Sequence, residues 1–515
     1  MRSGSSGKRL PPATLRNGSN RSAIGGNDLE THPHFGKNGS EKITMGSFSA
    51  ALSPPVLLAR FVDERQPRYS VRRTMTPPSP RKSHGSTGGP GYSRSAHRAR
   101  QHESAHADEK TGNHELKIPE HPLIPRNQPD LITSQSMLQE LIQHLCTVGS
   151  FAYDSEFIGE LTYHPKLCLV QVASAQRVSL IDPLSDDIDL TPFWELICEK
   201  NVEKIVHAGA QDVEPVIRHL GREPVNLFDT QIAAGFVGMA YPVSLSKLVM
   251  EIVGAKLGKG LTFTHWDQRP LSGMQLRYAA DDVRYLPALR AELGKRLDAL
   301  SHAQWCREEC EAMCDAKLYG FDPQTYYLRV RGAGSLTAQS LAVLRELTAW
   351  RDSAARESDV PPRSFLKDEV LVDLARSPVK NVEKLARVRG LPRPVEAQHG
   401  SAIVAATLRG LALPAAEMPQ MRHYEPSPTE RFRTDALWAA AQAICAGQSI
   451  DANLITNQKE IGEFYRHALA EKPANELSLM TGWRRAALGE PLLELMIGKR
   501  SINLSWGDGS LRTIV

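Results

Sequence analysis

Five short β-rich segments set the fold class of this 515-residue chain. They are FAYDSEF (151–157), LCLVQVAS (167–174), RVSLIDP (177–183), EKIVHAG (203–209) and NLFDT (226–230). The first three follow one another with short gaps, which is typical of an antiparallel meander. The last two alternate with helical segments, which is typical of crossover connections in an α/β domain. The pattern predicts one α/β domain on a mixed β-sheet, extending over residues 128–330.

Two helical segments follow this domain. Beyond residue 330 the β signal nearly vanishes, and residues 335–417 contain amphipathic stretches bounded by prolines and glycines. After a proline-containing linker, residues 428–515 are again mostly helical and end in INLSWGDGSLRTIV. That ending predicts a hairpin around Gly507, Asp508 and Gly509. We therefore expect one or two small all-α domains after the α/β domain.

The N-terminal segment, residues 1–127, differs in composition from the rest. It is rich in Gly, Ser, Pro, Arg and His and has no sustained apolar period, which predicts a disordered tail. It contains 20 Lys and Arg against 10 Asp and Glu, whereas the remaining 388 residues contain 42 against 48. A basic tail beside an acidic body suggests a polyanionic partner; the alternative is a solubilising extension. Met45 is an alternative start, which would leave a short Arg- and Ser-rich leader.

The cysteines and the hydropathy bear on compartment. No run of 18 or more apolar residues appears, so we expect no membrane span. Seven cysteines spread over the chain favour reduced thiols and a cytoplasmic location over a disulfide framework. Cys306, Cys310 and Cys314 lie along one helical stripe and could be metal ligands. Buried thiols on a core-facing stripe are the commoner explanation.

Two carboxylates share one face of the first predicted strand. Asp154 and Glu156 stand two residues apart, so their side chains leave the same side of the strand, about 6.6 Å apart along the chain. At this spacing both can reach one cation or two. The alternative is a surface pair on an edge strand, which the preceding residues Phe151, Ala152 and Tyr153 make less favourable.

Three further residues add to this pair. In QLRYAADDVRYLPAL, Tyr278 and Asp282 are four residues apart and lie on one helix face. Asp281 turns away by about 100°, which predicts a solvated side chain. Asp212 stands at the start of the helix after EKIVHAG, where an acidic residue is ordinarily a dipole partner or a cap.

Together, the four carboxylates and the tyrosine match the ligand demands of a two-metal phosphoryl-transfer site. Mg²⁺ and Mn²⁺ prefer oxygen ligands, and a pair of such ions about 4 Å apart can activate water and stabilise a departing oxygen. Like charges at about 4 Å repel by about 4 kcal/mol at an effective dielectric of 20, so cations would be needed to hold the cluster together.

The ordered blocks DSEF, HAGAQD, LFDTQIAAGF and FTHWDQRPLSGMQLRYAADDV resemble ribonuclease D, of the DEDDy group of 3′-5′ exonucleases. The similarity spans about residues 130–300. It implies a ribonuclease-H-like 3′-5′ exonuclease domain. Residues 335–417 resemble the helicase-and-RNase-D C-terminal (HRDC) domain, a nucleic-acid-binding module, and residues 428–515 look like a diverged second copy.

The resemblance also implies residue roles. Asp154, Glu156, Asp212 and Asp282 would hold two divalent metal ions, Mg²⁺ or Mn²⁺, and Tyr278 would orient the attacking water. An unperturbed phenol has a pKa near 10, so positioning is favoured over general-base chemistry.

Other positions also match the family or depart from it. Thr162, Tyr163 and Gln171 occupy family-like places that would bind the nucleotide, although packing is the commoner role for such residues. His207 and Asp229 are also family-like, and a hydrogen-bonded structural role is expected for both. Where the family often has arginines, this chain has Gly159, Leu161 and Ala210, which puts affinity and substrate choice in doubt.

The leading hypothesis is a metal-dependent 3′-5′ exoribonuclease that releases nucleoside 5′-monophosphates. Its partner would be RNA with a free 3′ end, and the resemblance implies tRNA precursors and a role in tRNA 3′ maturation. One alternative is a 3′-5′ DNA exonuclease with the same site. The sequence contains no polymerase or helicase motif, in particular no GxxxxGK[ST] loop, which favours stand-alone RNA trimming over this alternative. The other is a non-catalytic nucleic-acid-binding protein.

Overall fold

A six-stranded mixed sheet forms the centre of the first domain. The computed structural model describes residues 118–258, 264–419, 424–470, 477–507 and 510–514. The sheet order is β1-β4-β3-β2-β5-β6. The strands are β1 (Asp130–Ile132), β2 (Ser150–Ile158), β3 (Lys166–Ala173), β4 (Val178–Ile181), β5 (Glu203–Val206) and β6 (Leu227–Asp229). β2, β3 and β4 pair antiparallel, and β5 and β6 continue the sheet in parallel. The predicted mixed sheet is confirmed.

The N-terminal boundary of this domain lies earlier than expected. Residues 118–127 were assigned to the tail, but Ile124 is 3% exposed and packs in the core. The carbonyl oxygens of Pro125 and Asn127 accept hydrogen bonds from the buried Arg284. β1, which pairs parallel with β4, is a further strand that the sequence pattern does not predict. Residues 1–117 of the expected tail lie outside the described residues.

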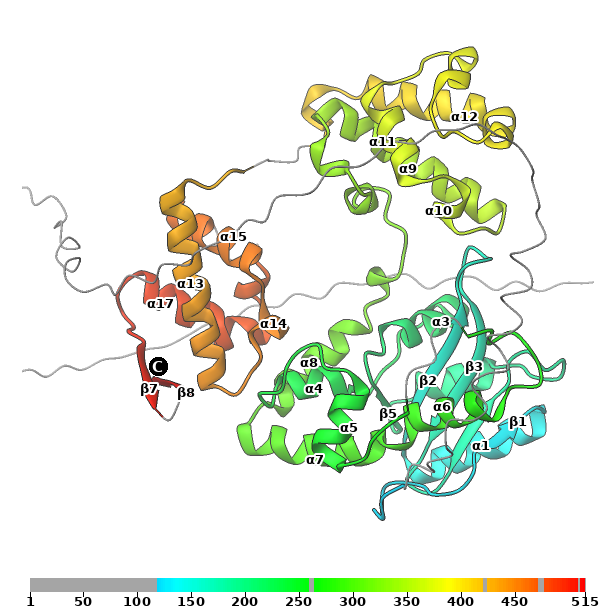
Figure 1. Cartoon of the computed structure of the whole chain (residues 1–515), viewed down its shortest axis with the longest axis vertical. Helices are drawn as coiled ribbons and strands as arrows, with labels where there is room; N and C mark the ends of the chain where they lie inside the picture. Colours follow the sequence, from blue (N-terminus) through cyan, green and yellow to red (C-terminus); the bar gives the residue numbers. More distant parts are fainter. Residues whose placement is uncertain (1–117, 259–263, 420–423, 471–476, 508–509, 515) are drawn as a thin grey trace, which may run out of the picture. The chain divides into compact units, whose positions relative to one another are not determined.

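Helices cover both faces of the sheet. They are α1 (Gln135–Val148), α2 (Thr191–Ile197), α3 (Ala210–Leu220), α4 (Thr230–Gly235), α5 (Leu245–Val253), α6 (Gly273–Arg284), α7 (Leu286–Leu300) and α8 (Ala303–Met313). Because strand side chains alternate, Phe151 and Tyr153 enter the core on the side of α1, α2 and α3. Ala152 enters the core on the other side, which contains α6 and α7. Figure 1 shows α6 lying across β2 and β3.

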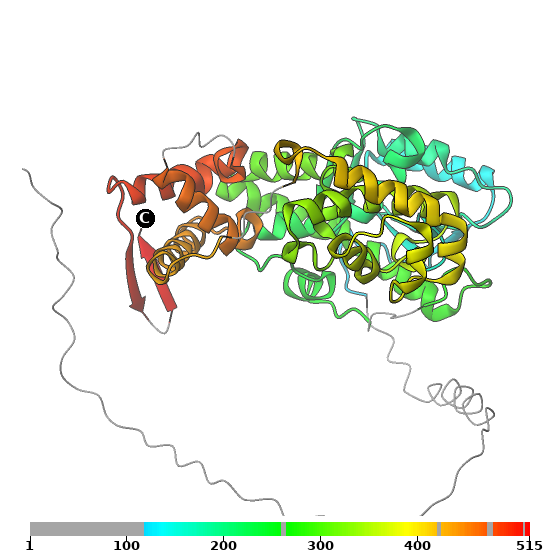
Figure 2. The same ribbon diagram turned by 90° about the horizontal axis from the view of Figure 1, so that it is seen from above.

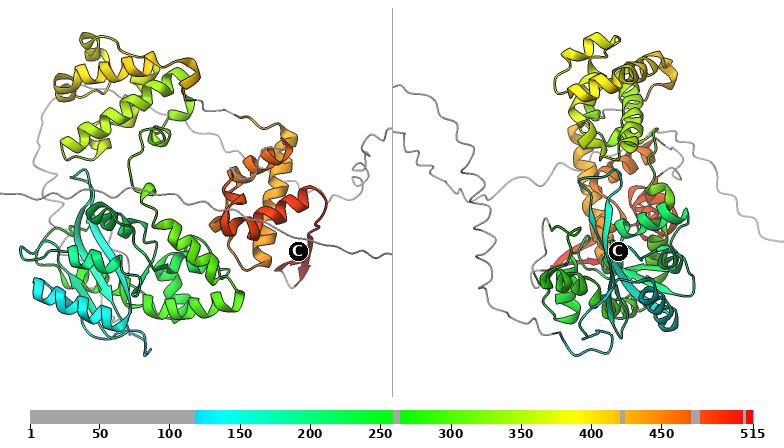
Figure 3. Two further views of the ribbon diagram at one scale, coloured as in Figure 1. Left: turned by 180° about the vertical axis from the view of Figure 1, so that it is seen from behind. Right: turned by 90° about the vertical axis from the view of Figure 1, so that its right-hand side faces the viewer.

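The second domain is all-helical, as predicted. Its α-helices are α9 (Ala338–Glu357), α10 (Pro362–Phe365), α11 (Asp368–Arg376) and α12 (Arg393–Ala412). α9 and α12 pack side by side (Figure 3). A Cβ atom at Gly410 would lie 2.5 Å from the backbone of Val343, so the close approach of these helices requires glycine there. Arg351 and Asp368 form a buried ion pair at 2.7 Å.

The last domain combines helices with a hairpin. Its main elements are α13 (Pro428–Gly447), α14 (Ala452–Ile455), α15 (Gln458–Leu469), α16 (Gly482–Arg484), α17 (Glu490–Met496), β7 (Asn503–Gly507) and β8 (Ser510–Ile514). β7 and β8 pair antiparallel, as predicted, next to α13 (Figure 2). The expected turn residues Asp508 and Gly509 lie outside the described residues. No helix in the described part of the chain combines the length and apolar composition that a bilayer crossing requires.

Candidate active site

β2 and α6 bring three of the predicted carboxylates together. Asp154 and Glu156 leave β2 on the face that α6 covers, and Asp282 approaches them from that helix. One oxygen from each of these three side chains lies within 4.8 Å of the other two. Among the His, Cys, Asp and Glu side chains of the described residues, these three carboxylates form a group with ligand atoms this close together.

The start of α6 is fixed by local sequence. Ser272 caps the helix and forms a capping box with Gln275, in which each side chain bonds the backbone N–H of the other. Arg269, just before the helix, donates to Asp182 and to the carbonyl oxygen of Cys168, so it ties this segment to the sheet. These contacts set the position at which Asp282 meets β2.

Asp281 does not point into solvent, and that expectation is wrong. Its carboxylate accepts a hydrogen bond from Arg284 Nε at 3.2 Å, and its side chain is 16% exposed. Arg284 is 4% exposed and therefore requires a charge partner. The i,i+3 spacing of this pair was visible in the sequence. The spacing does not predict that residues 118–127 bury the side chain of Arg284.

Asp212 lies in the first turn of α3 and is 4% exposed. It is not among the three carboxylates within 4.8 Å of one another, yet the Asp154 carboxylate is near enough to raise its pKa. Burial is the larger cause of that rise, which takes the pKa of Asp212 well above its ordinary value. The structure thus leaves Asp212 outside the group of three, within reach of the charge of Asp154, and its place in a metal site stays a prediction.

A carboxylate from β6 holds the turn that leads to Asp212. Asp229 is 1% exposed and accepts hydrogen bonds from the N–H groups of Ala208 and Gly209, at 3.2 and 2.9 Å. Ala208 has a φ of +58°, a left-handed conformation that an alanine adopts at a cost. Asp229 also caps α4. It therefore links two helix starts, one of which carries Asp212.

His207 has the structural role expected of it. Its Nε2 donates to the carbonyl oxygen of Val243 at 3.1 Å, and its Nδ1 lies 2.9 Å from the hydroxyl of Thr230. Burial lowers the pKa of the imidazole. Both nitrogens are thus engaged next to the turn that Asp229 holds.

Burial and mutual repulsion raise the pKa values of the cluster. Burial raises the pKa of Asp154 to about 6. Burial, followed by the charge of Asp154, raises that of Glu156 to about 8. Burial, followed by the charges of Asp154 and Glu156, raises the pKa of Asp282 to about 9. Carboxyls that resist ionisation this strongly are typical of a site whose charge is neutralised by cations.

The donor set fits hard divalent cations. All four residues offer carboxylate oxygens, which Mg²⁺ and Mn²⁺ prefer. Two of them come from one strand and two from the ends of different helices, so the ligands can surround ions between β2 and α6. Tyr278 is on α6, one turn before Asp282. Burial and the Asp282 carboxylate raise the pKa of its phenol, so the hydroxyl stays protonated at neutral pH.

The three residues expected near the nucleotide have different surroundings. The Thr162 hydroxyl donates within its own loop, to the carbonyl oxygen of His164 at 2.6 Å. The Tyr163 hydroxyl donates to Asp352 of α9 at 2.7 Å and accepts from Arg356 at 2.9 Å. Gln171 has no exposed surface, so no nucleotide can touch it in this conformation.

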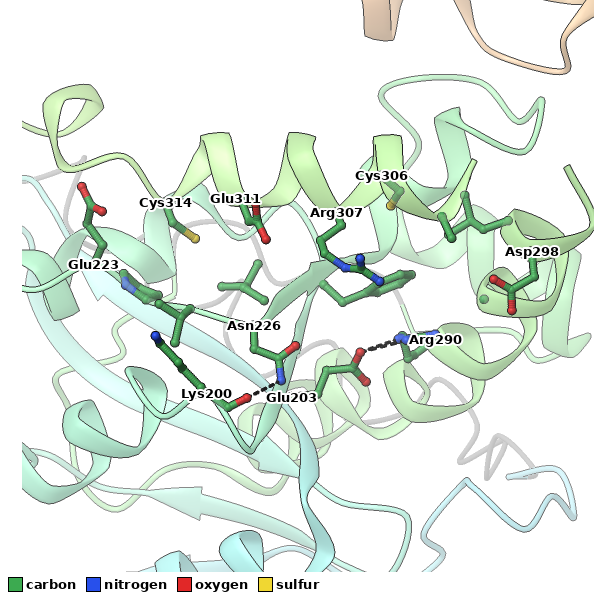
Figure 4. A pocket seen from close by; sticks show the side chains of 17 residues that line it. Lys200, Glu203, Glu223, Asn226, Arg290, Asp298, Cys306, Arg307, Glu311 and Cys314 are labelled. Carbon is green, nitrogen blue, oxygen red and sulfur yellow. Dashed lines mark hydrogen bonds and ion pairs between the residues drawn. The ribbon is translucent and has the colours of Figure 1, made fainter. Parts of the chain in front are cut away.

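The cysteine stripe of α8 and its C-cap residue Cys314 does not form a group of converging ligands among the described residues. Cys306, Cys310 and Cys314 are all buried, and the thiol of Cys310 accepts the N–H of Asp229 at 3.4 Å. Figure 4 shows Cys306 and Cys314 lining a cavity of about 560 Å³, which Leu227 and Phe228 of β6 also line. Among the described residues, none of these three thiols belongs to a group of three ligand atoms within 4.8 Å of one another. Packing of small thiols, the commoner explanation, accounts for the stripe.

Comparisons with known proteins agree with this geometry. A family described as 3′-5′ exonuclease matches residues 129–298, and the HRDC domain family matches residues 340–407. Ribonuclease D of Gluconacetobacter diazotrophicus is 34% identical over 373 residues, covering 72% of this chain and 93% of its own. Ribonuclease D of Pseudomonas paraeruginosa is 36% identical over 367 residues, covering 71% and 96%.

A solved structure leads to the same family. The crystal structure of Escherichia coli RNase D matches with a TM-score of 0.64 and 28% identity, covering 73% of this chain and all of that one. The ribonuclease-H-like exonuclease domain followed by HRDC-type helices, expected from the sequence, is confirmed. The chain therefore belongs to the ribonuclease D family and is a 3′-5′ exoribonuclease.

Proposed function

We propose that Asp154, Glu156, Asp212 and Asp282 hold two divalent cations, Mg²⁺ or Mn²⁺, at the active site of this exoribonuclease. The observation that carries the proposal is the convergence of three carboxylates within 4.8 Å from two elements far apart in the sequence. The exonuclease family is metal-dependent. The raised pKa values add support, because uncompensated carboxylates at this density would take up protons.

The chain's own residues would then divide the work of hydrolysis. When bound, the cations would supply activation of the attacking water and stabilisation of the leaving oxygen. The four carboxylates would fix where this happens, and Tyr278, still protonated, would orient the water through its hydroxyl. The water oxygen bonds to the terminal phosphorus as the bond to the 3′ oxygen of the preceding nucleotide breaks. A nucleoside 5′-monophosphate leaves, and the shortened RNA keeps a 3′-hydroxyl.

Structured RNA is the proposed substrate class, and tRNA precursors the proposed substrates, in the cytoplasm. Escherichia coli RNase D is an exoribonuclease involved in structured RNA processing. The exonuclease segment, residues 128–330, contains 18 Lys and Arg against 27 Asp and Glu, so it repels RNA away from the site. Basic groups elsewhere would offset this repulsion. Arg387, Arg389 and Arg393, all exposed next to the start of α12, would contact phosphates.

One assay tests the proposal. Matched 3′-labelled RNA and DNA are incubated with the full chain in Mg²⁺, in Mn²⁺ and in excess chelator. We expect cation-dependent release of nucleoside monophosphates from RNA. Cleavage that survives the chelator would contradict the metal site, and preferential digestion of DNA would contradict the RNA substrate. Binding without any cleavage would contradict catalysis by this cluster.

A further inference from the structure

The amide of Gln171 is buried without a hydrogen-bond partner in the part of the chain that the structure describes. The side chain, on β3, has no exposed surface. Neither Oε1 nor Nε2 has a partner among the described residues. A buried amide normally bonds both atoms, because leaving them unpaired forfeits the hydrogen bonds they made in water. Gln171 therefore needs an explanation that the packing of the sheet does not provide.

The strand register sets Gln171 beside the acidic cluster. Gln171 is directly opposite Asp154 in the antiparallel pair of β2 and β3, so the two side chains leave the same face of the sheet. On its other side Gln171 is opposite Leu180 of β4, which is apolar. The neighbours two residues along β3, Leu169 and Ala173, are apolar as well. The polar groups next to this amide on these strands are therefore the carboxylates of Asp154 and, diagonally, Glu156.

We propose that Gln171 is a positioning residue, whose Nε2 donates to the Asp154 carboxylate when the acidic cluster holds divalent cations. The inference rests on the proposed metal site. A carboxylate that directs one lone pair at a cation accepts hydrogen bonds through its others, and such outer donors orient the ligand. The amide is well suited because it is neutral: a lysine or arginine would compete with the cations for the same carboxylate.

This assignment predicts opposite effects on stability and on metal binding. Without cations this assignment gives the amide no partner among the described residues, so replacing it with an apolar side chain of similar volume removes a cost. In the metal-bound protein the same replacement removes a donor to a charged ligand. A residue that only packs would change both properties in the same direction, or would change stability alone.

The test uses Gln171→Met in the full chain, with Gln171→Leu as a second variant. Two quantities are measured: the Tm in excess chelator, and Mn²⁺ affinity by calorimetry well below the Tm. We expect the Tm to stay unchanged or to rise by about 2–4 °C. We expect Mn²⁺ affinity to fall by roughly 10- to 100-fold, as for other outer-shell donors.

Tyr153→Phe is the matched control. Its hydroxyl is also buried without a partner among the described residues, but the side chain leaves β2 on the opposite face, toward Phe151 and Phe193. We expect its Tm to stay unchanged or to rise and its Mn²⁺ affinity to fall less than that of Gln171→Met, because its hydroxyl is within reach of the charge of Asp212 but bonds none of the described residues.

Two results would overturn the inference. One is wild-type Mn²⁺ affinity in Gln171→Met; the other is a clear fall of its chelator Tm, which would mean that the amide is already bonded without metal. Failure of the proposed function gives a different result. The unmodified chain would then bind no Mn²⁺, or its Mn²⁺ binding would persist in Asp154→Asn.

Discussion

Asp281 and Asp282 are neighbours on α6 that serve different partners. Asp282 lies within 4.8 Å of Asp154 and Glu156, whereas Asp281 accepts a hydrogen bond from the buried Arg284 at 3.2 Å. Arg284 in turn donates to the carbonyl oxygens of Pro125 and Asn127. One residue thus belongs to the proposed metal site, and the other anchors the N-terminal segment of the domain.

Paired substitutions separate these roles. Asp282→Asn removes a metal ligand, so we expect RNA hydrolysis to fall by roughly 10³-fold, the equivalent of about 4 kcal/mol. Its stability without metal should not fall, because folding no longer requires this carboxyl to take up a proton at neutral pH. Asp281→Asn weakens a buried ion pair, so its free energy of unfolding should drop by about 1–3 kcal/mol while Mn²⁺ affinity is kept. Melting curves measure the stability of both variants, and calorimetry measures their Mn²⁺ affinity. If the two variants changed stability and Mn²⁺ affinity in the same way, the assignment would be contradicted.

Asp229 is expected to act on Asp212 through the Ala208–Gly209 turn. Asp229→Asn keeps one acceptor oxygen but turns an NH₂ group toward backbone N–H donors. We expect a stability loss of about 2 kcal/mol and weaker Mn²⁺ binding. In an Asp212→Asn background the substitution should weaken Mn²⁺ binding little further, because the residue it positions is already lost.

Asp451→Asn is the control for Asp229→Asn. Asp451 caps α14 through the N–H of Asn453 at 2.8 Å, in the last domain. Because Asn caps helices about as well as Asp, this substitution should change the free energy of unfolding by less than about 0.5 kcal/mol and leave Mn²⁺ affinity unchanged. Additive effects of Asp229→Asn and Asp212→Asn on Mn²⁺ binding would show that the turn does not connect them.

The acidic cluster predicts that the metal-free protein loses stability as the pH rises. In the unfolded chain these carboxyls ionise near pH 4, whereas in the folded protein the pKa of Glu156 is about 8 and that of Asp282 about 9. Between these limits the folded protein binds more protons than the unfolded chain. The free energy of unfolding should therefore fall as the pH rises from about 4 to about 9.

Divalent cations should reverse this loss. They bind the ionised carboxylates, and Mn²⁺ at about 100 times its Kd should add about 2.7 kcal/mol to the free energy of unfolding. Melts in chelator and in Mn²⁺ across this pH range measure both effects. In Asp282→Asn the slope with pH should be shallower. A Tm without pH dependence in chelator, or without a Mn²⁺ effect at high pH, would contradict the cluster.

Tyr278 is expected to position water without giving up its proton. Burial and Asp282 raise the pKa of the phenol, so it remains protonated throughout the range of ordinary assays. Tyr278→Phe should lower kcat by roughly 10- to 100-fold through lost orientation. The pH–rate profile should keep its shape, since no titrating group has been removed. A profile in which wild type and variant diverge with increasing pH below 9 would instead indicate a general base.

Much of this fold could be predicted because its signals are local. The antiparallel meander, the shift to parallel strands and the i,i+4 relation of Tyr278 to Asp282 all follow from periods of two and 3.6 residues. Asp281 could not be placed, because its partner Arg284 is buried by a segment 157 to 159 residues earlier in the sequence, with no periodic signal of its own. Gln171 was expected near the nucleotide only because it occupies a family-like place, and a resemblance of sequence does not show what covers a strand residue. The pairing that sets Gln171 opposite Asp154 depends on how β2 and β3 align in the folded chain, which the local sequence does not specify.

The basic N-terminal segment provides the last prediction. Residues 1–117 contain 19 Lys and Arg against 9 Asp and Glu, and the described domain starts directly after them. Deleting 1–117 keeps Ile124 and Pro125, which the domain needs. Each lysine or arginine that contacts a phosphate releases a counterion, so the deletion should lower RNA affinity and flatten the plot of log affinity against log salt.

Arg389→Ala, which removes one exposed charge in the second domain, should reduce the slope by about one at most. An unchanged slope in the deletion would mean that the segment does not touch RNA and that the HRDC-type helices carry the electrostatic attraction.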